Sequence, residues 1–409
     1  MAYRLLGRNF TPPDIEAKVT GRAKYAEDFR ADGMAHVKFL GSPVPHGRVR
    51  AIDTAEAERV PGVLAILRPD EVKAPPAPGH PILWAEPAHF GAPVVAVAAE
   101  TEQAAADAVA LIRLDIEERP FVTDPLDSLK PGGADARRGG NVAGQGVEFG
   151  RVGWTGRDLA LAGEGRLPEG KAPVLWQQGD LEAAFARAAL VLDETIVHAS
   201  NAHHSMEPRS AAAWWQGGRC HVRGSTQSTA YAQPGLAAMI GIAPEDLVLV
   251  AEFCGGGFGS KAAAYPLMAL PAVMSRKLGG RPCLLRVSRA EEYDNGAARA
   301  GFQARMKLGF GPDGRLMAAD LFLVQDSGAT SGFPDFLHAG DALSLVYRPE
   351  AMRLRAVPVL TNTVPKSAQR GPGENQLANM IEPLIDTAAR KLGVDRLEIR
   401  RINAPGGGG

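Results

Sequence analysis

A run of glycines is the feature of this sequence that most directly suggests ligand chemistry. Residues 255–261 read Gly-Gly-Gly-Phe-Gly-Ser-Lys, between an expected strand and an expected helix. Because glycine has no side chain, its backbone N–H groups can approach a ligand closely and form an anion-binding concavity. A P-loop requires serine or threonine directly after the lysine, and Ala262 stands there; a GxGxxG fingerprint starting at Gly255 ends on Ser260. The pattern favours a ligand-binding loop of another kind over a plain tight turn.

Two further polar residues could join such a site. Arg370-Gly371-Pro372-Gly373 forms a second glycine loop before a helical pattern, where the helix N-terminus attracts anions and an arginine adds two parallel donors. An ordinary loop with a solvated arginine explains this segment equally well. Gln227 follows an expected strand and could offer amide donors, although a lone glutamine is more often a surface residue.

Other polar clusters favour structural roles. His203 and His204 are adjacent, would point to opposite faces of a strand, and have no third ligand at metal spacing near Glu207. Glu382 and Asp386 share one helical face, as solvated or loop-capping pairs usually do. No signature surrounds a nucleophilic serine or cysteine.

The composition is that of an ordinary globular protein. The chain has 409 residues, 45% of them hydrophobic and 22% charged, so a disordered chain is excluded. A net charge of -1 gives no overall attraction for nucleic acid. Without an apolar run of ~20 residues or a signal peptide, we expect no membrane association and a cytoplasmic location. Three scattered cysteines cannot form an iron–sulfur cluster or a four-cysteine zinc site.

The elements that must position these residues fall into three segments. Residues 1–125 predict a compact unit of mixed helices and strands, in which Thr101 caps a helix over 102–111. Residues 126–175 are rich in glycine, proline and charge, and predict a linker or a wrapping arm with little regular structure. Residues 176–409 predict short strands and helices that carry both glycine loops. The expected strands are 35–40, 62–67, 93–99, 112–117, 190–195, 211–215, 220–224, 247–252, 284–287, 304–310 and 316–325, and the later helices are 181–189, 262–278, 377–392 and 396–402.

Taken in chain order, these motifs resemble those of the molybdenum-binding subunit of the xanthine dehydrogenase/aldehyde oxidase family of molybdenum hydroxylases. The resemblance covers nearly the whole chain. The matching segments are Lys18–Asp28, Met206-Glu207-Pro208, Ser225-Thr226-Gln227, Gly255–Lys261, Asp326–Ala329, Thr361-Asn362, Arg370–Gly373, Glu382 with Asp386, and Arg400 with Asn403. The family implies an α+β fold, with an α/β hammerhead domain in residues 1–125, the linker in 126–175 and the first molybdenum-cofactor-binding domain in 176–409.

The resemblance also implies an activity and a set of site residues. The family hydroxylates an electron-poor carbon of an N-heteroaromatic compound or an aldehyde, with water as the oxygen source. Molybdenum would be held through the dithiolene of molybdopterin, expected as the cytosine dinucleotide, and not by side chains. The matching catalytic positions are Gln227, Phe258 and Arg370, and the cofactor-binding positions are Gln227, Gly256, Gly257, Phe258, Gly259, Arg370 and Gly371.

Departures from the family pattern shape the expected partners and substrate. In the family, the second half of the subunit contains a late Gly-x-Gly-Glu whose glutamate acts as the base. This half has no counterpart here, so we expect a partner chain that carries the glutamate. An FAD subunit and a [2Fe-2S] subunit would accept the electrons. Ala262 and Pro372 stand where xanthine-oxidising members have glutamate and phenylalanine, and the cysteine loop of carbon monoxide dehydrogenases is missing. The alternative is a non-catalytic scaffold subunit that has lost metal chemistry.

Overall fold

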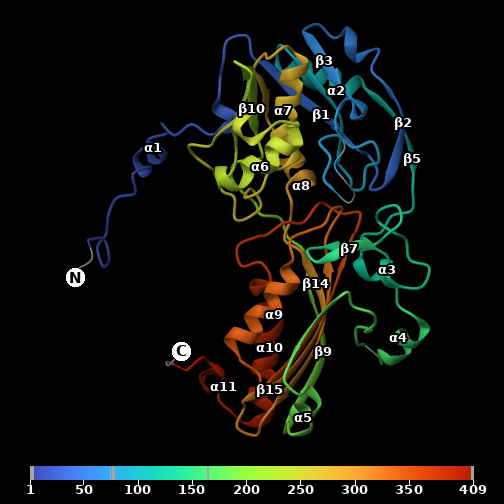
Figure 1. Cartoon of the computed structure of the whole chain (residues 1–409), viewed down its shortest axis with the longest axis vertical. Helices are drawn as coiled ribbons and strands as arrows, with labels where there is room; N and C mark the ends of the chain where they lie inside the picture. Colours follow the sequence, from blue (N-terminus) through green and yellow to red (C-terminus); the bar gives the residue numbers. More distant parts are fainter. Residues whose placement is uncertain (1–3, 74, 76–78, 164, 407–409) are drawn as a thin grey trace.

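The first of two large sheets draws its strands from two separate parts of the sequence, residues 35–99 and 211–285. The computed structural model describes residues 4–73, 75, 79–163 and 165–406, and Figure 1 shows this sheet in the upper part of the molecule. Its strand order is β12-β11-β10-β13-β1-β4-β3. The bounds are β1 Ala35–Gly41, β3 Val63–Leu67, β4 Pro93–Ala99, β10 Ala211–Gln216, β11 Arg219–Gly224, β12 Leu247–Val250 and β13 Cys283–Leu285. Because β1 pairs in parallel with β13, the N-terminal segment is continuous with the later part of the chain.

Alternation along β4 explains how helices cover both faces of this sheet. Val95 and Val97 pack with Ala108 of α2 (Glu102–Leu111), whereas Ala96 and Ala98 belong to the core formed with α6 (Thr229–Ile240) and α7 (Pro266–Lys277). Successive side chains of a strand point to opposite faces, so a strand that is apolar throughout is buried on both sides. A small separate sheet pairs β2 (Gly47–Asp53) with β5 (Arg113–Glu118).

The second large sheet lies in the lower part of Figure 1, with two helices against one face. Its strand order is β7-β6-β16-β15-β14-β9, and β8 also pairs with β16. The bounds are β6 Val142–Gly144, β7 Val147–Gly150, β8 Val174–Gln178, β9 Leu190–His198, β14 Gly301–Phe310, β15 Leu316–Asp326 and β16 Ala351–Val359. α9 (Asp335–Val346) and α10 (Glu374–Leu392) bury their apolar faces against it. The N-terminus of α10 therefore begins at a fixed place relative to this sheet.

Several predicted elements are present with their predicted caps. Thr101 caps α2, Asp180 caps α5 (Leu181–Ala186), and Asp395 caps α11 (Arg396–Asn403), each through its side-chain oxygen. Gly393 ends α10 in the left-handed conformation, as expected for a helix C-terminus. The helix predicted from residue 262 begins at Pro266 instead, because proline is favoured in the first turn of a helix.

The segment 126–175 has more regular structure than its composition predicts. It contains most of α3 (Pro125–Leu129), all of β6, β7 and α4 (Gly156–Leu161), and the first residues of β8. The buried amide of Asn141 donates to the carbonyls of Ser128 (3.2 Å) and Val152 (2.8 Å), and β6 adds to the edge of β16. Long-range hydrogen bonds thus order a glycine-rich stretch that local propensity alone would leave irregular.

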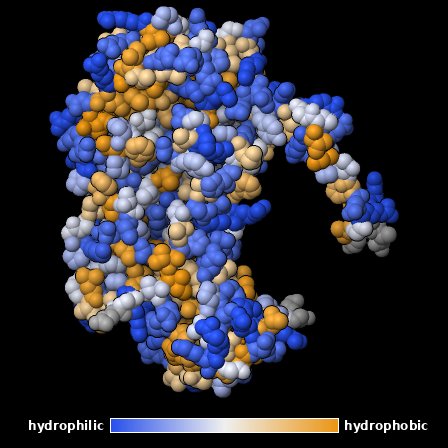
Figure 2. Space-filling view, turned by 180° about the vertical axis from the view of Figure 1, so that it is seen from behind, coloured by the Kyte–Doolittle hydropathy of each residue, from blue (hydrophilic) through white to orange (hydrophobic). Residues whose placement is uncertain are grey.

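α1 (Ile15–Val19) lies on an N-terminal segment that projects away from the body of the protein (Figures 1 and 2).

α8 (Arg289–Asn295), like α6, α9, β2, β8 and β16, has no counterpart among the elements predicted from the sequence. None of the helices described here combines the length and the apolar character needed to cross a membrane.

Candidate functional site

The Gly255–Ser260 loop joins β12 to α7 and requires glycine at specific points. Gly256, Phe258 and Gly259 have φ angles of 109°, 52° and 107°, in a region that side chains disfavour. A Cβ atom at position 259 would overlap the carbonyl of Ala368, and one at 257 would overlap the side chain of Gln227. Glycines therefore let this loop approach two neighbouring segments, while Phe258, 39% exposed, holds a strained conformation.

Gln227 is held against this loop in one orientation. The N–H of Gly259 donates to Oε1 of Gln227 at 2.8 Å, and the N–H of Gln227 donates to the carbonyl of Lys261 at 3.2 Å. Since a backbone N–H can only donate, the atom that faces Gly259 must be the amide oxygen. The amide nitrogen of this exposed side chain is thereby left to donate to an oxygen atom of a ligand.

The arginine loop packs directly against the glycine loop. The N–H of Arg370 donates to the carbonyl of Phe258 at 2.6 Å, and the guanidinium carbon lies 5.6 Å from the centre of the Phe258 ring. Arg299, which is buried, donates to the carbonyls of Arg370 (2.9 Å) and Gly371 (3.0 Å). Gln227, Gly256–Gly259 and Arg370 thus form one surface, although they come from three distant parts of the sequence.

This surface presents hydrogen-bond donors that the described residues leave without acceptors. Within the described part of the chain, the N–H groups of Gly256, Gly257, Phe258 and Gly371 donate no hydrogen bond. Gly257 is buried, and a buried N–H without a partner costs free energy. Together with the Gln227 amide and the exposed Arg370 guanidinium, these groups fit an anionic, oxygen-rich ligand.

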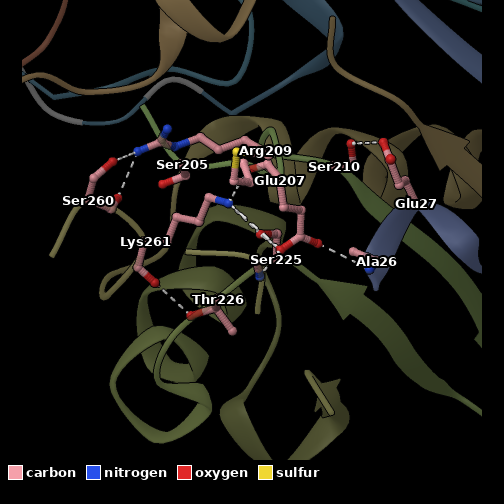
Figure 3. Close-up of polar contacts among 12 residues, drawn as sticks. Ala26, Glu27, Ser205, Glu207, Arg209, Ser210, Ser225, Thr226, Ser260 and Lys261 are labelled. Atoms are coloured by element: carbon pink, nitrogen blue, oxygen red, sulfur yellow. Dashed lines mark hydrogen bonds and ion pairs between the residues drawn. The ribbon is translucent and has the colours of Figure 1, made fainter. Parts of the chain in front are cut away.

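Lys261, the last residue of the glycine motif, is fully buried, and its side chain points toward Glu207 and Ser225 (Figure 3). Its ammonium group donates to the carbonyl of Glu207 at 2.5 Å and to the hydroxyl of Ser225 at 2.7 Å. Desolvation lowers the pKa of Lys261, and the nearby charge of Glu207 opposes that shift. This lysine bonds the residues packed against the loop inside the protein and does not offer its charge to a ligand.

A polar network beneath the arginine loop has no motif in the sequence that would reveal it. Oε1 of Gln376 accepts from the N–H of Gly373 (2.9 Å) and from Arg299 (3.1 Å), and its amide nitrogen donates to Asp335 (2.5 Å). Burial raises the pKa of the Asp335 carboxyl to about 7, while the hydrogen bond from Gln376 and the charge of Arg299 oppose that rise. These buried groups connect α9, the segment that leads into β14, and the N-terminus of α10.

The remaining polar candidates make structural contacts. A ring nitrogen of His203 lies 3.0 Å from the carbonyl of Ala368, and His204 lies 3.0 Å from the hydroxyl of Tyr293. Glu382 and Asp386 pair with Arg400 of α11 at 2.6 Å and 2.9 Å. The pairs of Glu382 and Asp386 join α10 to α11, and His203 bonds the Ala368 carbonyl that lies against Gly259.

Family models match both parts of the chain. Residues 166–404 match the model described as "Molybdopterin cofactor-binding domain". Residues 20–120 match the model described as "Aldehyde oxidase and xanthine dehydrogenase, a/b hammerhead domain". The first match alone covers more than half of the chain.

Individual relatives agree with these models. The chain is 28% identical over 411 residues to the xanthine dehydrogenase molybdenum-binding subunit of Escherichia coli, covering 96% of this chain and 51% of that protein. It is 25% identical over 414 residues to the nicotinate dehydrogenase large molybdopterin subunit of Eubacterium barkeri, covering 98% of this chain and 90% of that protein. The structure of the aldehyde oxidoreductase from Desulfovibrio gigas matches 97% of this chain and 43% of its own length, with a TM-score of 0.83 and 26% identity.

The chain spans about half the length of the first curated relatives that it matches. The resemblance of motifs, the mixed α/β architecture and both domain matches lead to the same assignment. The chain belongs to the xanthine dehydrogenase/aldehyde oxidase family of molybdenum hydroxylases and contains a hammerhead-type domain and a molybdopterin cofactor-binding domain.

Proposed function

We propose that this chain forms one half of the molybdenum-cofactor subunit of a hydroxylase. Its substrate would be an N-heteroaromatic compound or an aldehyde, hydroxylated at an electron-poor carbon with water as the oxygen source. The observation that carries this proposal is a single surface whose donors make no hydrogen bond among the described residues, namely the N–H groups of residues 256–258, the Gln227 amide nitrogen and the Arg370 guanidinium. That surface fits the phosphate and oxygen atoms of molybdopterin.

Each residue of this surface has a definite task in the proposed site. The amide nitrogen of Gln227 would donate to an oxygen at the metal or on the pterin, because its oxygen is already engaged by Gly259. Arg370 would offset negative charge, and the Phe258 ring would exclude water from the reacting centre. When bound, the molybdenum cofactor supplies the oxidation chemistry.

The same geometry opposes the alternative of a non-catalytic scaffold. Phe258 keeps a positive φ angle, and the N–H of buried Gly257 has no acceptor in the described ranges. Both features cost stability and gain nothing unless a ligand occupies the surface. A scaffold subunit would be more stable without either.

We also propose that a second chain completes the site and carries the glutamate that acts as the base. The 90% coverage of the Eubacterium barkeri subunit supports an arrangement in which a molybdopterin subunit of this size works with other chains. Met206, which precedes Glu207 and is 87% exposed, and Tyr231, four residues after Gln227 and 67% exposed, would be covered by that chain. An FAD subunit and a [2Fe-2S] subunit would complete the assembly, with molybdopterin in the cytosine dinucleotide form.

The metal content of the assembled complex separates these alternatives. We expect about one molybdenum atom and one pterin per chain in the complex purified with its partners, together with oxidation of an aldehyde or an N-heteroaromatic compound. Nucleotide released from the complex by acid would identify the dinucleotide. An intact complex in which this chain carries neither molybdenum nor pterin would favour the scaffold and contradict the proposal.

A further inference from the structure

Four buried charged side chains lie directly beneath the Gly255–Ser260 loop (Figure 3 shows three of them). Glu207, Arg209, Lys261 and Glu292 are each less than one tenth exposed. Removing charges from water is costly, and an apolar core of similar volume is often at least as stable as a buried ion pair. A charged cluster in this position therefore suggests a role that an apolar core could not fill.

Glu207 bonds the beginning of the glycine loop. Its Oε2 accepts from the N–H of Gly255 at 2.7 Å and from the hydroxyl of Ser225 at 2.7 Å. Its Oε1 accepts from the N–H of Ala26 at 3.2 Å. A Cβ atom at position 255 would overlap the Glu207 side chain, so glycine permits this approach. One carboxylate thus connects the glycine loop, the segment that leads to Gln227, and the N-terminal part of the chain.

Arg209 bonds the other end of the same loop. Its guanidinium donates to the carbonyl of Ser260 at 2.9 Å and also to the Ser260 hydroxyl. A second nitrogen of that guanidinium donates to Glu292, whose carboxylate also accepts from the backbone N–H of Arg209 at 2.8 Å. The guanidinium carbon lies 5.2 Å from the centre of the Tyr265 ring. Arg209 is therefore fixed on two sides while it holds Ser260.

We propose that Glu207-Pro208-Arg209 is a positioning clamp for the glycine loop. The tripeptide fixes both ends of the loop, and the proline between the two charged residues restricts the backbone that separates them. Strained φ angles such as that of Phe258 persist only when the surroundings over-determine them. The clamp supplies that constraint, and through Gly259 it keeps the Gln227 amide in its donating orientation. The part of this inference that concerns cofactor binding rests on the proposed function.

Amide hydrogen exchange tests the clamp independently of activity, in the enzyme purified with its partner subunits. In Glu207→Ala, we expect exchange of the hydrogen-bonded loop amides of Gly255, Gly259 and Ser260 to accelerate about 10-fold or more, the factor for losing one hydrogen bond to a charged group. Amides of the β14–β15 pair should keep their rates. Glu207→Gln retains one acceptor at nearly constant volume and should give a smaller acceleration. It also serves as the test variant if Glu207→Ala does not fold.

Asp320 provides a matched control. It is also buried, and its carboxylate pairs with Arg353 and Arg355 on the second large sheet. Asp320→Ala should leave exchange of the 255–260 amides unchanged, although it removes a comparable buried charge. Unchanged loop exchange in both Glu207 variants, or equal acceleration in Asp320→Ala, would overturn the clamp.

Molybdenum content separates the clamp from the proposed function. If the loop exchanges faster in Glu207→Ala and the complex loses molybdenum and pterin, both are supported. If the loop exchanges faster and the metal content stays unchanged, the clamp is supported and the assignment of this loop to the cofactor is wrong.

Discussion

Gly259 illustrates how the conformation of one residue determines what the glycine loop can do. Its φ of 107° turns the chain, its N–H fixes the Gln227 amide at 2.8 Å, and its missing Cβ leaves room for the Ala368 carbonyl. A larger residue at this position would disturb all three relationships at once. The neighbouring donors of Gly256–Phe258 depend on the same turn.

Gly259→Val should therefore remove the cofactor without unfolding the protein. We expect molybdenum content to fall to background while the circular dichroism spectrum of the complex stays unchanged. Gly146→Val is the matched control, because Gly146 also has a positive φ of 73° but a Cβ there meets no atom within 4 Å. Full metal content and turnover in Gly259→Val would refute the assignment of this loop.

Ala262 bears on the choice of substrate. A carboxylate at this position would give a purine ring a charge-assisted hydrogen bond worth ~1.5–3 kcal/mol, and alanine cannot provide it. We expect the assembled enzyme to oxidise xanthine poorly relative to an aldehyde or an N-heteroaromatic compound, as measured by kcat/KM. Efficient xanthine turnover by the unmodified enzyme would contradict this interpretation.

Some residues of the candidate site could be selected from the sequence, and others could not. Gln227, Phe258 and Arg370 stand in or beside short motifs, so their types and order were sufficient to select them. Arg299 acts on Arg370 and on Gln376, which lie 71 and 77 positions away. No local pattern marks such a contact, since it exists only once β14 and α10 have packed together.

Among the elements, α10 is joined to α9 beneath the arginine loop, because Gln376 of α10 donates to the carboxylate of Asp335 of α9. The usual pKa of 3.8 applies in the unfolded chain, and burial raises the folded value to about 7. At a pH between these two pKa values, the Asp335 carboxyl is ionised in the unfolded chain but still protonated in the folded one. The contribution of Asp335 to the free energy of unfolding therefore falls as pH rises through this range. Below about pH 4 both states are protonated, and the full contribution is retained.

Asp335→Asn should remove this pH dependence, because the amide stays neutral and can still accept from Gln376. We expect the free energy of unfolding of the variant in urea, relative to the unmodified protein, to be higher at pH 8 than at pH 5, by an amount on the order of a few kcal/mol. Comparing the two proteins at each pH cancels the titration of other groups. If the free energy of unfolding of the variant minus that of the unmodified protein is constant with pH, or is larger at pH 5, the raised pKa of Asp335 is contradicted.

The predictability of an element depended on whether local chemistry or long-range pairing formed it. α10 followed from its apolar periodicity, and α2 followed from alanine content and the Thr101 cap. α6 contains Pro234 and Gly235, which oppose helix in isolation, yet it packs against α7. Similarly, β6 forms because β16 offers an edge, which composition cannot reveal.

The two large sheets place the site at the junction of the first sheet with the arginine loop. β12 leads into the glycine loop and β11 leads into Gln227, whereas Arg299, just before β14, and Gln376 of α10 hold the arginine loop. Neither sheet alone carries the whole donor set. The pairing of β1 with β13 further joins the hammerhead-type segment to this framework, so the arrangement depends on the complete fold.

Exposed apolar side chains predict how the chain behaves without partners. Leu5, Leu6 and Phe10 on the projecting N-terminal segment are exposed, as are Met206 and Tyr231 (Figure 2 shows the projecting segment). Such surface is usually covered in an obligate complex. We expect residues 1–409 purified alone to be poorly soluble or free of cofactor, and hydroxylase activity to require co-expression with the second half. A soluble, loaded and active isolated chain would contradict the two-chain proposal.

The position of the metal is the most direct test of the central claim, that Gln227, the glycine loop and Arg370 form the molybdenum-cofactor surface. Crystals of the assembled complex, with data collected at the molybdenum absorption edge, would locate the metal by its anomalous signal. The predicted result is a peak on the surface beside Gln227, Phe258 and Arg370, with pterin density against the Gly256–Gly259 backbone. A molybdenum peak elsewhere in a complex of full metal content would contradict the account.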